Sequence, residues 1–276
     1  MSRFWIVFLL TLAAVLPGCT EPPEAIHGPP LDTSGFWSNE TDDRSDLRPA
    51  RRVARIRVSH IEVPSGQSSD SEEIWSYLAE EPIGADRLAE LGRNGLRVGL
   101  GRSDMWADVA EVLKRMTGRE LTESVQVGHP GSLHHIALKR RQDVQTIFIF
   151  HADRTLSGSD LPPGDNVLTI ACTVDQDDSQ KMLLTGIPQV RSTRPRTRYA
   201  KGARGVRMIK ESVMFGFRDL LFQVPMNAKD FLVIGPGAAA RRPHSVGRHF
   251  FVRQKEGMEF ETVLVLTPEV LDVPVK

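Results

Sequence analysis

Short segments in which apolar residues alternate with polar ones, or run together, dominate the chain beyond residue 120. Such segments lie at residues 124–127, 133–138, 145–150, 167–174, 180–185, 220–224, 231–234, 249–253 and 258–267. Alternation with a period of two puts the apolar side chains on one face of a β-strand, and strands this closely spaced are joined by turns. The pattern therefore predicts a mostly antiparallel β part, with hairpin turns at residues 175–178 and 255–257.

The preceding stretch mixes strands with helices. Residues 53–63 and 96–100 alternate in the same way and predict two strands. Helices are predicted behind a capping box at Ser69–Glu72, over residues 85–91, and after Ser103, which we expect to be an N-cap. The predicted fold class is therefore α+β, in which a small helix-containing N-terminal part is followed by the mainly β part.

Length and composition agree with a folded body and exclude several classes of protein. The 276 residues suffice for one or two domains, and we place an α+β part at residues 51–120 and the mainly β part at 121–276. With 40% hydrophobic and 25% charged residues, the chain is neither a disordered polyelectrolyte nor an integral membrane protein. Because 35 Lys and Arg balance 35 Asp and Glu, bulk attraction to nucleic acid or to anionic lipid is not expected.

The N-terminus has the features of an export signal. Arg3 precedes an apolar run, Phe4–Leu16, which as a helix would span about 20 Å and so fall short of the ~30 Å hydrocarbon core of a bilayer. A signal peptide over residues 1–18 therefore fits better than a transmembrane helix. The run ends in Leu16-Pro17-Gly18-Cys19, which resembles the lipobox of bacterial lipoproteins.

This resemblance implies cleavage before Cys19 and attachment of lipid to the Cys19 thiol and the new N-terminus. An ordinary secretory signal followed by a chance Gly-Cys is the alternative. In lipoproteins of two-membrane bacteria, a residue such as Thr20 after the cysteine implies sorting to the outer membrane, on its periplasmic or surface side. We therefore expect an exported protein held to a bacterial membrane by its lipid anchor.

Residues 19–50 differ in composition from the folded body. They are rich in proline and acidic residues and poor in aliphatic ones, so they bury too little apolar area to offset the entropy of ordering. We predict a disordered tether. Cys19 is consumed by lipid in this scheme, and the remaining Cys172 lies in a strand-like run, where we expect a buried, inert thiol.

Motifs for catalysis and for cofactors are scarce. The sequence has no Walker loop, no HExxH and no GxSxG elbow. Residues 235–240 imitate a dinucleotide loop, but Pro243 follows closely and no amphipathic run begins there, so we expect a turn. His134 and His135 alternate along a strand and face opposite ways. No catalytic residue, metal or cofactor is therefore predicted.

One charged segment stands out. Residues 191–210 carry eight basic residues and no acid. We predict an exposed loop, with a strand near 206–209, that docks on an anionic partner such as lipopolysaccharide, phospholipid headgroups, a wall polymer or an acidic protein. The alternative is a solvated loop whose charges are neutralised by acids elsewhere on the body. The candidate binding residues are Arg191, Arg194, Arg196, Arg198, Lys201, Arg204 and Arg207.

Two further resemblances concern short stretches. Residues Arg93–Gly99, after a Trp-containing helix, resemble a segment of uncharacterised lipoproteins of planctomycete-type bacteria, for which no activity can be carried over. Residues Ser245–Phe251 together with Phe260–Val270 are similar to the closing hairpin of secretin channel domains. That similarity covers roughly 25 of the 276 residues, and the β sector is too short for a channel.

These features together favour a lipid-anchored, non-catalytic envelope protein that binds or assembles with other envelope components. One alternative is a lipid-anchored hydrolase of wall or surface polymers, whose catalytic residues are dispersed in the sequence. Another is a β-rich structural subunit of a secretion or surface assembly, which adds strands to a neighbour at an exposed edge. A site where acids or histidines converge would favour the hydrolase, and a basic surface would favour binding.

Overall fold

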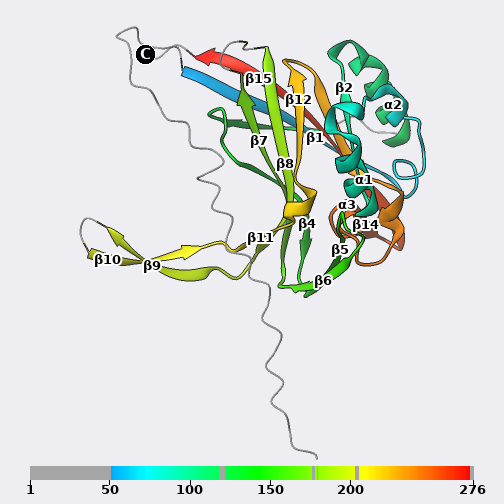
Figure 1. The fold of residues 1–276 in the computed structure, drawn as a ribbon. Coiled ribbons are helices and arrows are strands. Elements are labelled where there is room, and N and C mark those ends of the chain that lie inside the picture. Colours follow the sequence, from blue (N-terminus) through cyan, green and yellow to red (C-terminus); the bar gives the residue numbers. More distant parts are fainter. Residues whose placement is uncertain (1–50, 118–121, 176–177, 179, 203–204, 274–276) are drawn as a thin grey trace, which may run out of the picture.

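A computed structural model of the protein describes residues 51–117, 122–175, 178, 180–202 and 205–273. Antiparallel strands dominate these residues, accompanied by a few short helices, so the α+β class predicted from the sequence is confirmed (Figure 1). The predicted signal peptide, the lipidation site Cys19 and the tether at 19–50 lie outside the described residues, as does Arg204.

The larger sheet takes strands from both ends of the described chain. Its order is β2 (Leu96–Gly101), β13 (Phe231–Pro236), β15 (Met258–Val273), β1 (Arg51–Pro64) and β3 (Thr122–Gly128), and β14 (Val252–Lys255) also pairs with β15. The β1–β15 pair is the longest and runs from Arg51 opposite Val273 to Pro64 opposite Phe260. The first and last described strands are therefore neighbours.

A second sheet and two ribbons complete the β structure. The sheet has the order β11 (Met214–Gly216), β8 (Lys181–Ser192), β7 (Gly164–Val174) and β4 (His134–Arg141), and β12 (Phe222–Asn227) also pairs with β8. The ribbons are β5 (Gln145–Phe150) with β6 (Leu156–Leu161), and β9 (Arg196–Gly202) with β10 (Gly205–Glu211). β7 pairs antiparallel with β8, and β14 pairs antiparallel with β15, as the two predicted hairpins require. Residues 176 and 177 of the first predicted turn lie outside the described residues.

The central strands of the larger sheet are buried on both faces. Leu264 and Leu266 of β15 belong to the main core, which also holds residues of the second sheet. Val263 and Val265 of the same strand face the other way and pack in a cluster with the helix α2 (Trp106–Thr117). Since successive side chains of a strand point to opposite faces, a strand covered on both sides is apolar throughout. This explains the continuous apolar runs in the sequence.

The predicted bounds of the helices need correction. The helix α1 (Ala85–Arg93) extends two residues beyond the predicted end, but α2 begins at Trp106, because Ser103 lies in a 3-10 turn where its N–H donates to Asp230. The predicted capping box is wrong as well. The Ser69 hydroxyl donates to the buried Glu261, and the predicted helix is replaced by a 3-10 turn at Trp75–Tyr77, which a second 3-10 turn follows at Glu81–Ile83.

The strand predicted at 249–253 is also wrong in its first half. The helix α3 spans Val246–Phe251, and its N-cap Ser245 accepts a hydrogen bond from the Arg248 N–H. Phe250 and Phe251 are adjacent and both fully buried, because α3 is enclosed by other elements. A short apolar run of this kind fits a buried helix as well as a strand. A further 3-10 turn, η5 (Arg218–Leu220), links β11 to β12.

Candidate functional site

The basic segment forms a β-hairpin instead of the predicted loop. β9 and β10 pair from Gly202 opposite Gly205 to Arg196 opposite Glu211, and the ribbon projects from the body of the molecule (Figure 1). The strand expected near 206–209 is present as β10, but β9 was missed. Its arginine-rich sequence shows no apolar alternation, so the strand conformation depends on pairing with β10 and not on local propensity.

The two faces of the β9–β10 hairpin differ in chemistry. Residues paired across antiparallel strands share a face, so Tyr199 lies beside Met208, and Lys201 lies beside Val206. Tyr199, Val206 and Met208 are 70%, 68% and 60% exposed. The opposite face carries three arginines together with Ala200, Ile209 and Glu211; the arginines are Arg196, Arg198 and Arg207. One face is therefore apolar with lysines at its border, and the other is mainly cationic.

The candidate binding residues do not all belong to this hairpin. Arg191 lies in β8, where its Nη2 donates to Asp165 Oδ2 at 2.9 Å, so an acid of the body neutralises it. Arg198 Nη1 lies 3.8 Å from Glu211 Oε2 within the hairpin itself. The others described are Arg194, just before β9, and Arg196, Lys201 and Arg207 on the hairpin; among the described residues these four form no ion pair.

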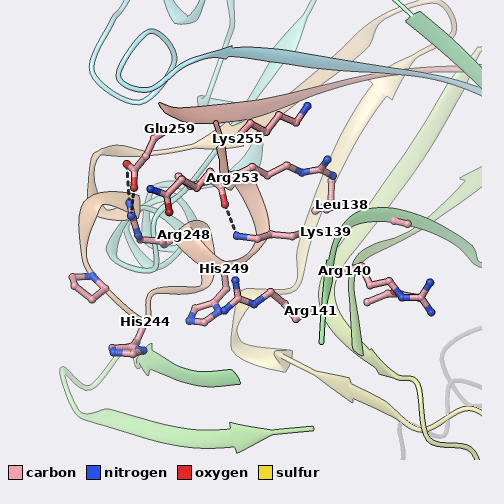
Figure 2. A pocket seen from close by; sticks show the side chains of 15 residues that line it. Leu138, Lys139, Arg140, Arg141, His244, Arg248, His249, Arg253, Lys255 and Glu259 are labelled. Atoms are coloured by element: carbon pink, nitrogen blue, oxygen red, sulfur yellow. Dashed lines mark hydrogen bonds and ion pairs between the residues drawn. The ribbon is translucent and has the colours of Figure 1, made fainter. Parts of the chain in front are cut away.

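A second basic feature was not predicted from the sequence. A cleft of about 870 Å³ opens between β4 and the segment formed by α3 and β14 (Figure 2). We call it the basic cleft. It is lined by two histidines, His244 and His249, by two carboxylates, Asp165 and Glu259, and by six cationic side chains, namely Lys139, Arg140, Arg141, Arg248, Arg253 and Lys255. Positive charge therefore exceeds negative charge along its walls.

Ion pairs neutralise only part of this charge. Arg248 forms an ion pair with Glu259, Arg140 forms one with Asp165, and Arg253 and Lys255 share Glu62. Lys139 has no carboxylate partner among the described residues, and its Nζ donates to the Val252 carbonyl oxygen at 2.5 Å. Burial, which is the largest cause, and the charges of the nearby arginines together lower the pKa of Lys139 to about 8.

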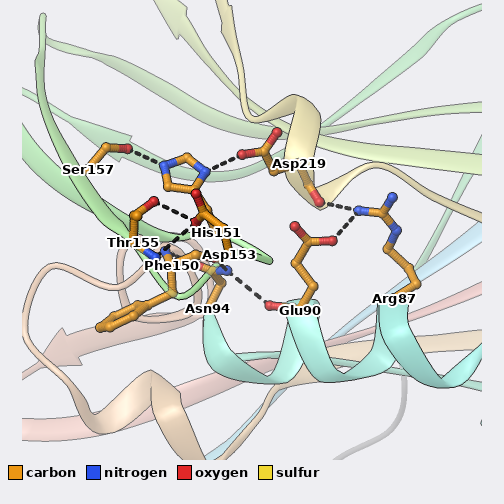
Figure 3. Close-up of polar contacts among 9 residues, drawn as sticks. All are labelled: Arg87, Glu90, Asn94, Phe150, His151, Asp153, Thr155, Ser157 and Asp219. Atoms are coloured by element: carbon orange, nitrogen blue, oxygen red, sulfur yellow. Dashed lines mark hydrogen bonds and ion pairs between the residues drawn. The ribbon is translucent and has the colours of Figure 1, made fainter.

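The third feature is a chain of hydrogen bonds through His151 (Figure 3). His151, which follows β5, has its Nε2 2.6 Å from Ser157 Oγ in β6 and its Nδ1 2.5 Å from Asp219 Oδ2 in η5. A serine, a histidine and a carboxylate in this order are the arrangement by which hydrolases activate a serine nucleophile. We call these three residues the Ser157 relay. No sequence pattern points to these three residues, because they lie on three separate elements and match no short motif.

Side chains of α1 and its cap position the Ser157 relay. Arg87 donates to Glu90 Oε2 at 2.6 Å and also to the carbonyl oxygen of Asp219. Asn94, the C-cap of α1, exchanges two hydrogen bonds with the backbone of Phe150, at 2.8 and 2.9 Å. The histidine is partly exposed, since 28% of its side-chain surface is accessible. The relay is therefore held at the surface, outside the lining of the basic cleft.

A sheet edge offers a fourth feature. β3 is the last strand in the order of the larger sheet, and its Val125 and Val127 are 51% and 62% exposed. An edge strand presents unpaired backbone groups to which another strand can add. This edge is where strand addition, expected above as one alternative function, would occur.

Several sequence expectations concern groups away from these features. Cys172 is buried, and burial raises the pKa of its thiol to about 11, as fits the predicted inert thiol. Within the part of the chain that the structure describes, no three His, Cys, Asp or Glu side chains gather as metal ligands. None of the described helices is long and apolar enough to span a bilayer.

No protein-family model matches this chain, and neither a curated protein nor a solved structure matches it. The resemblances to lipoproteins and to the secretin hairpin therefore stay predictions.

Proposed function

We propose that the protein is a lipid-anchored, non-catalytic component of the bacterial envelope, and that its β9–β10 hairpin docks on the anionic surface of a membrane. The observation that carries this proposal is the pairing of an exposed apolar face, around Tyr199 and Met208, with an arginine face on one projecting ribbon. The lipobox at Leu16–Cys19 and the acidic tether support the anchoring.

The chemistry of the hairpin suits the headgroup region of a bilayer. Segments that lie in this region combine apolar or aromatic side chains with lysines and arginines at their borders. Each basic residue near an anionic bilayer contributes about 1 kcal/mol, an attraction that salt screens. Such docking is weak on its own, but the proposed lipid anchor would hold the hairpin near the surface and raise its effective concentration.

Vesicle sedimentation tests the docking. Residues 51–276, which lack the proposed anchor, are mixed with vesicles of phosphatidylcholine alone or with phosphatidylglycerol added. We expect binding only to the anionic vesicles and its loss at high salt. A variant with Arg196, Arg198 and Arg207 changed to Gln should no longer bind, and Tyr199→Ser with Met208→Ser should weaken binding. The matched control changes Arg102, Lys114 and Arg115 to Gln, which removes the same charge elsewhere.

Two results would count against the docking. Binding that persists at high salt, or that falls equally in the control variant, would mean that the hairpin has no special part. The anchor is tested separately by mass spectrometry of the mature protein purified from membranes. We expect an N-terminal Cys19 that carries acyl chains, and a free thiol at that position would contradict the anchoring.

A second candidate function, hydrolysis, is favoured by one specific observation, the Ser157 relay. In this function His151 would take the proton of the Ser157 hydroxyl, and Asp219 would hold the ring and stabilise its charged form. A fluorophosphonate probe, which labels activated serines, distinguishes the two functions. Hydrolysis predicts labelling that Ser157→Ala and His151→Gln abolish and that the control Ser159→Ala, in the same strand, leaves intact. Labelling that survives Ser157→Ala rules this function out.

A further inference from the structure

We propose that the basic cleft is a binding site for a small soluble compound that carries two or more phosphate groups. This goes beyond the proposed function, because the cleft and the β9–β10 hairpin share no residue and the two take different ligands.

Unused hydrogen-bond donors line the cleft. Within the described ranges, Lys139 Nζ makes one hydrogen bond, to the Val252 carbonyl, so two of its three donor hydrogens are left for a ligand. Arg141 forms no ion pair or side-chain hydrogen bond among the described residues. The Nε of Arg253 is buried and has no hydrogen-bond partner in the described part of the chain. Since buried donors are nearly always satisfied, this one indicates a missing acceptor.

Electrostatic repulsion within the cleft points the same way. The pKa of Lys139 is lowered to about 8 by burial first and then by Arg141, Arg253 and Arg248, while Glu259 opposes this effect. The pKa of His249 is lowered to about 4 by burial first and then by Arg141, Lys139 and His244. Cationic groups that disfavour one another's charge are stabilised when an anion binds between them.

Figure 2 shows how these groups converge. Lys139 and Arg141, from β4, point toward the side of the cleft formed by His249 and Arg253. Hydrogen bonding to β7 on one side and to β15 on the other fixes the two walls, β4 and β14. The positive groups are therefore already in position before any ligand arrives, which lowers the free-energy cost of binding.

Size and donor chemistry select the ligand class. A volume of about 870 Å³ lies within the range of small-molecule sites and exceeds what one phosphate group needs. Guanidinium groups match the oxygens of phosphate in a bidentate manner, and a lysine adds a point charge. A concave site between two sheets receives a soluble molecule more readily than the flat surface of a bilayer. A compact compound with several phosphate groups fits these requirements.

Isothermal titration of the full chain with inorganic tripolyphosphate tests the assignment. We expect one site per chain, with inorganic phosphate binding more weakly. Lys139→Met and Arg141→Gln should each weaken binding about tenfold or more. Two controls remove a single charge elsewhere, Lys114→Gln and Arg115→Gln on α2, and they should change the affinity by less than about twofold. Because Lys139 is repelled by its neighbours, Lys139→Met should leave the melting temperature unchanged or raised.

Three results would overturn the assignment. The first is no tripolyphosphate binding by the unaltered chain, the second is unchanged affinity in both cleft variants, and the third is an equal loss in all four variants, which would reflect net charge alone. The docking proposal is tested separately, because the basic cleft and the β9–β10 hairpin share no residue. Vesicle binding that fails while tripolyphosphate still binds would reject the docking and retain the cleft.

Discussion

A single carboxylate, that of Glu261, holds the loop that follows β1. It is 2% exposed and accepts hydrogen bonds from the N–H groups of Gly66, Ser68 and Ser69, and from the Ser69 hydroxyl. Ser69 was expected to cap a helix because a serine followed three residues later by a glutamate is typical of a helix start. The distant Glu261 competes successfully for the same donors.

Replacement of Glu261 by alanine should therefore destabilise the fold. It leaves three backbone donors and one hydroxyl without their acceptor, and we expect a loss of about 3 kcal/mol in the free energy of unfolding. Urea denaturation measures it. Glu111→Ala, at an exposed position of α2, should stay within about 0.5 kcal/mol of the unaltered protein. Equal effects of the two substitutions would contradict the part assigned to Glu261.

His249 should make stability depend on pH. Its pKa is lowered to about 4 in the fold, by burial first, whereas an unfolded histidine titrates near 6.5. Below about pH 6.5 the unfolded chain therefore binds a proton that the folded chain does not bind. The contribution of His249 to stability thus falls as pH drops from about 6.5 to about 4, and it is constant above that range.

Substitution of His249 tests this pH dependence. Between pH 7 and pH 4 the free energy of unfolding should fall by roughly 1–2 kcal/mol less in His249→Gln than in the unaltered protein, a modest difference because the ring is only partly buried. Urea denaturation at both pH values measures the difference. His60, His134 and His135 also have lowered pKa values, so a residual dependence should remain. His129→Gln, at an exposed position before β4, is the control, and a change as large in this variant would contradict the prediction.

At the scale of elements, α3 depends on close approach to the turn after α1. The Gly247 N–H donates to the Asn94 carbonyl at 2.9 Å, and a Cβ atom on Gly247 would lie only 1.9 Å from the Gly95 carbonyl oxygen. Gly247→Ala should therefore lower the free energy of unfolding by more than about 3 kcal/mol, or prevent folding. Gly92→Ala is the opposite case. Its added Cβ meets nothing within 4 Å inside α1, so it should stabilise by up to about 1 kcal/mol.

Urea denaturation of both glycine variants checks this pair of predictions. A Gly247→Ala protein as stable as the unaltered chain would mean that α3 can move away from the turn. The contact could not be predicted from the sequence, because it joins residues about 150 positions apart and depends on how α3 packs.

Elements could be predicted where their own residues decide the conformation. β1 and β15 were recognisable because apolar residues recur with a period of two, or run together where both faces are covered. β6 was missed because Ser157, Gly158 and Ser159 carry no such pattern, so its pairing with β5 depends on distant contacts. The α3 region was ambiguous because six residues are too few to show a period.

The candidate sites divide in the same way. The basic hairpin could be found from composition, since its arginines and lysines are neighbours in the sequence. The basic cleft could not, because Lys139 and Arg253 lie in β4 and β14, which meet only in the fold. The Ser157 relay joins His151 to Asp219 across 68 positions, and each of these residue types is too common to stand out alone.

At the scale of the whole molecule, the order of strands ties the two parts of the chain together. β2 and β1 come from residues 51–120, but β13 and β15 lie between them in the larger sheet. The apolar face of α2 packs in a cluster with Val233 and Val263, which also come from the later part. Residues 51–120 alone would therefore lack the two strands between β2 and β1 and would leave the apolar face of α2 partly uncovered.

A fragment of residues 51–120 should consequently not fold, whereas residues 51–276 should unfold in one cooperative step. Without β13 and β15, β1 and β2 have no neighbour to satisfy their backbone groups, and the apolar face of α2 loses its contacts with Val233 and Val263. Amide NMR spectra measure the outcome: we expect poor dispersion for the fragment and good dispersion for residues 51–276. A well-dispersed spectrum from the fragment would show that the earlier part has a core of its own. In that case residues 51–120 would fold by themselves, and β13 and β15 would not be needed for that part of the fold.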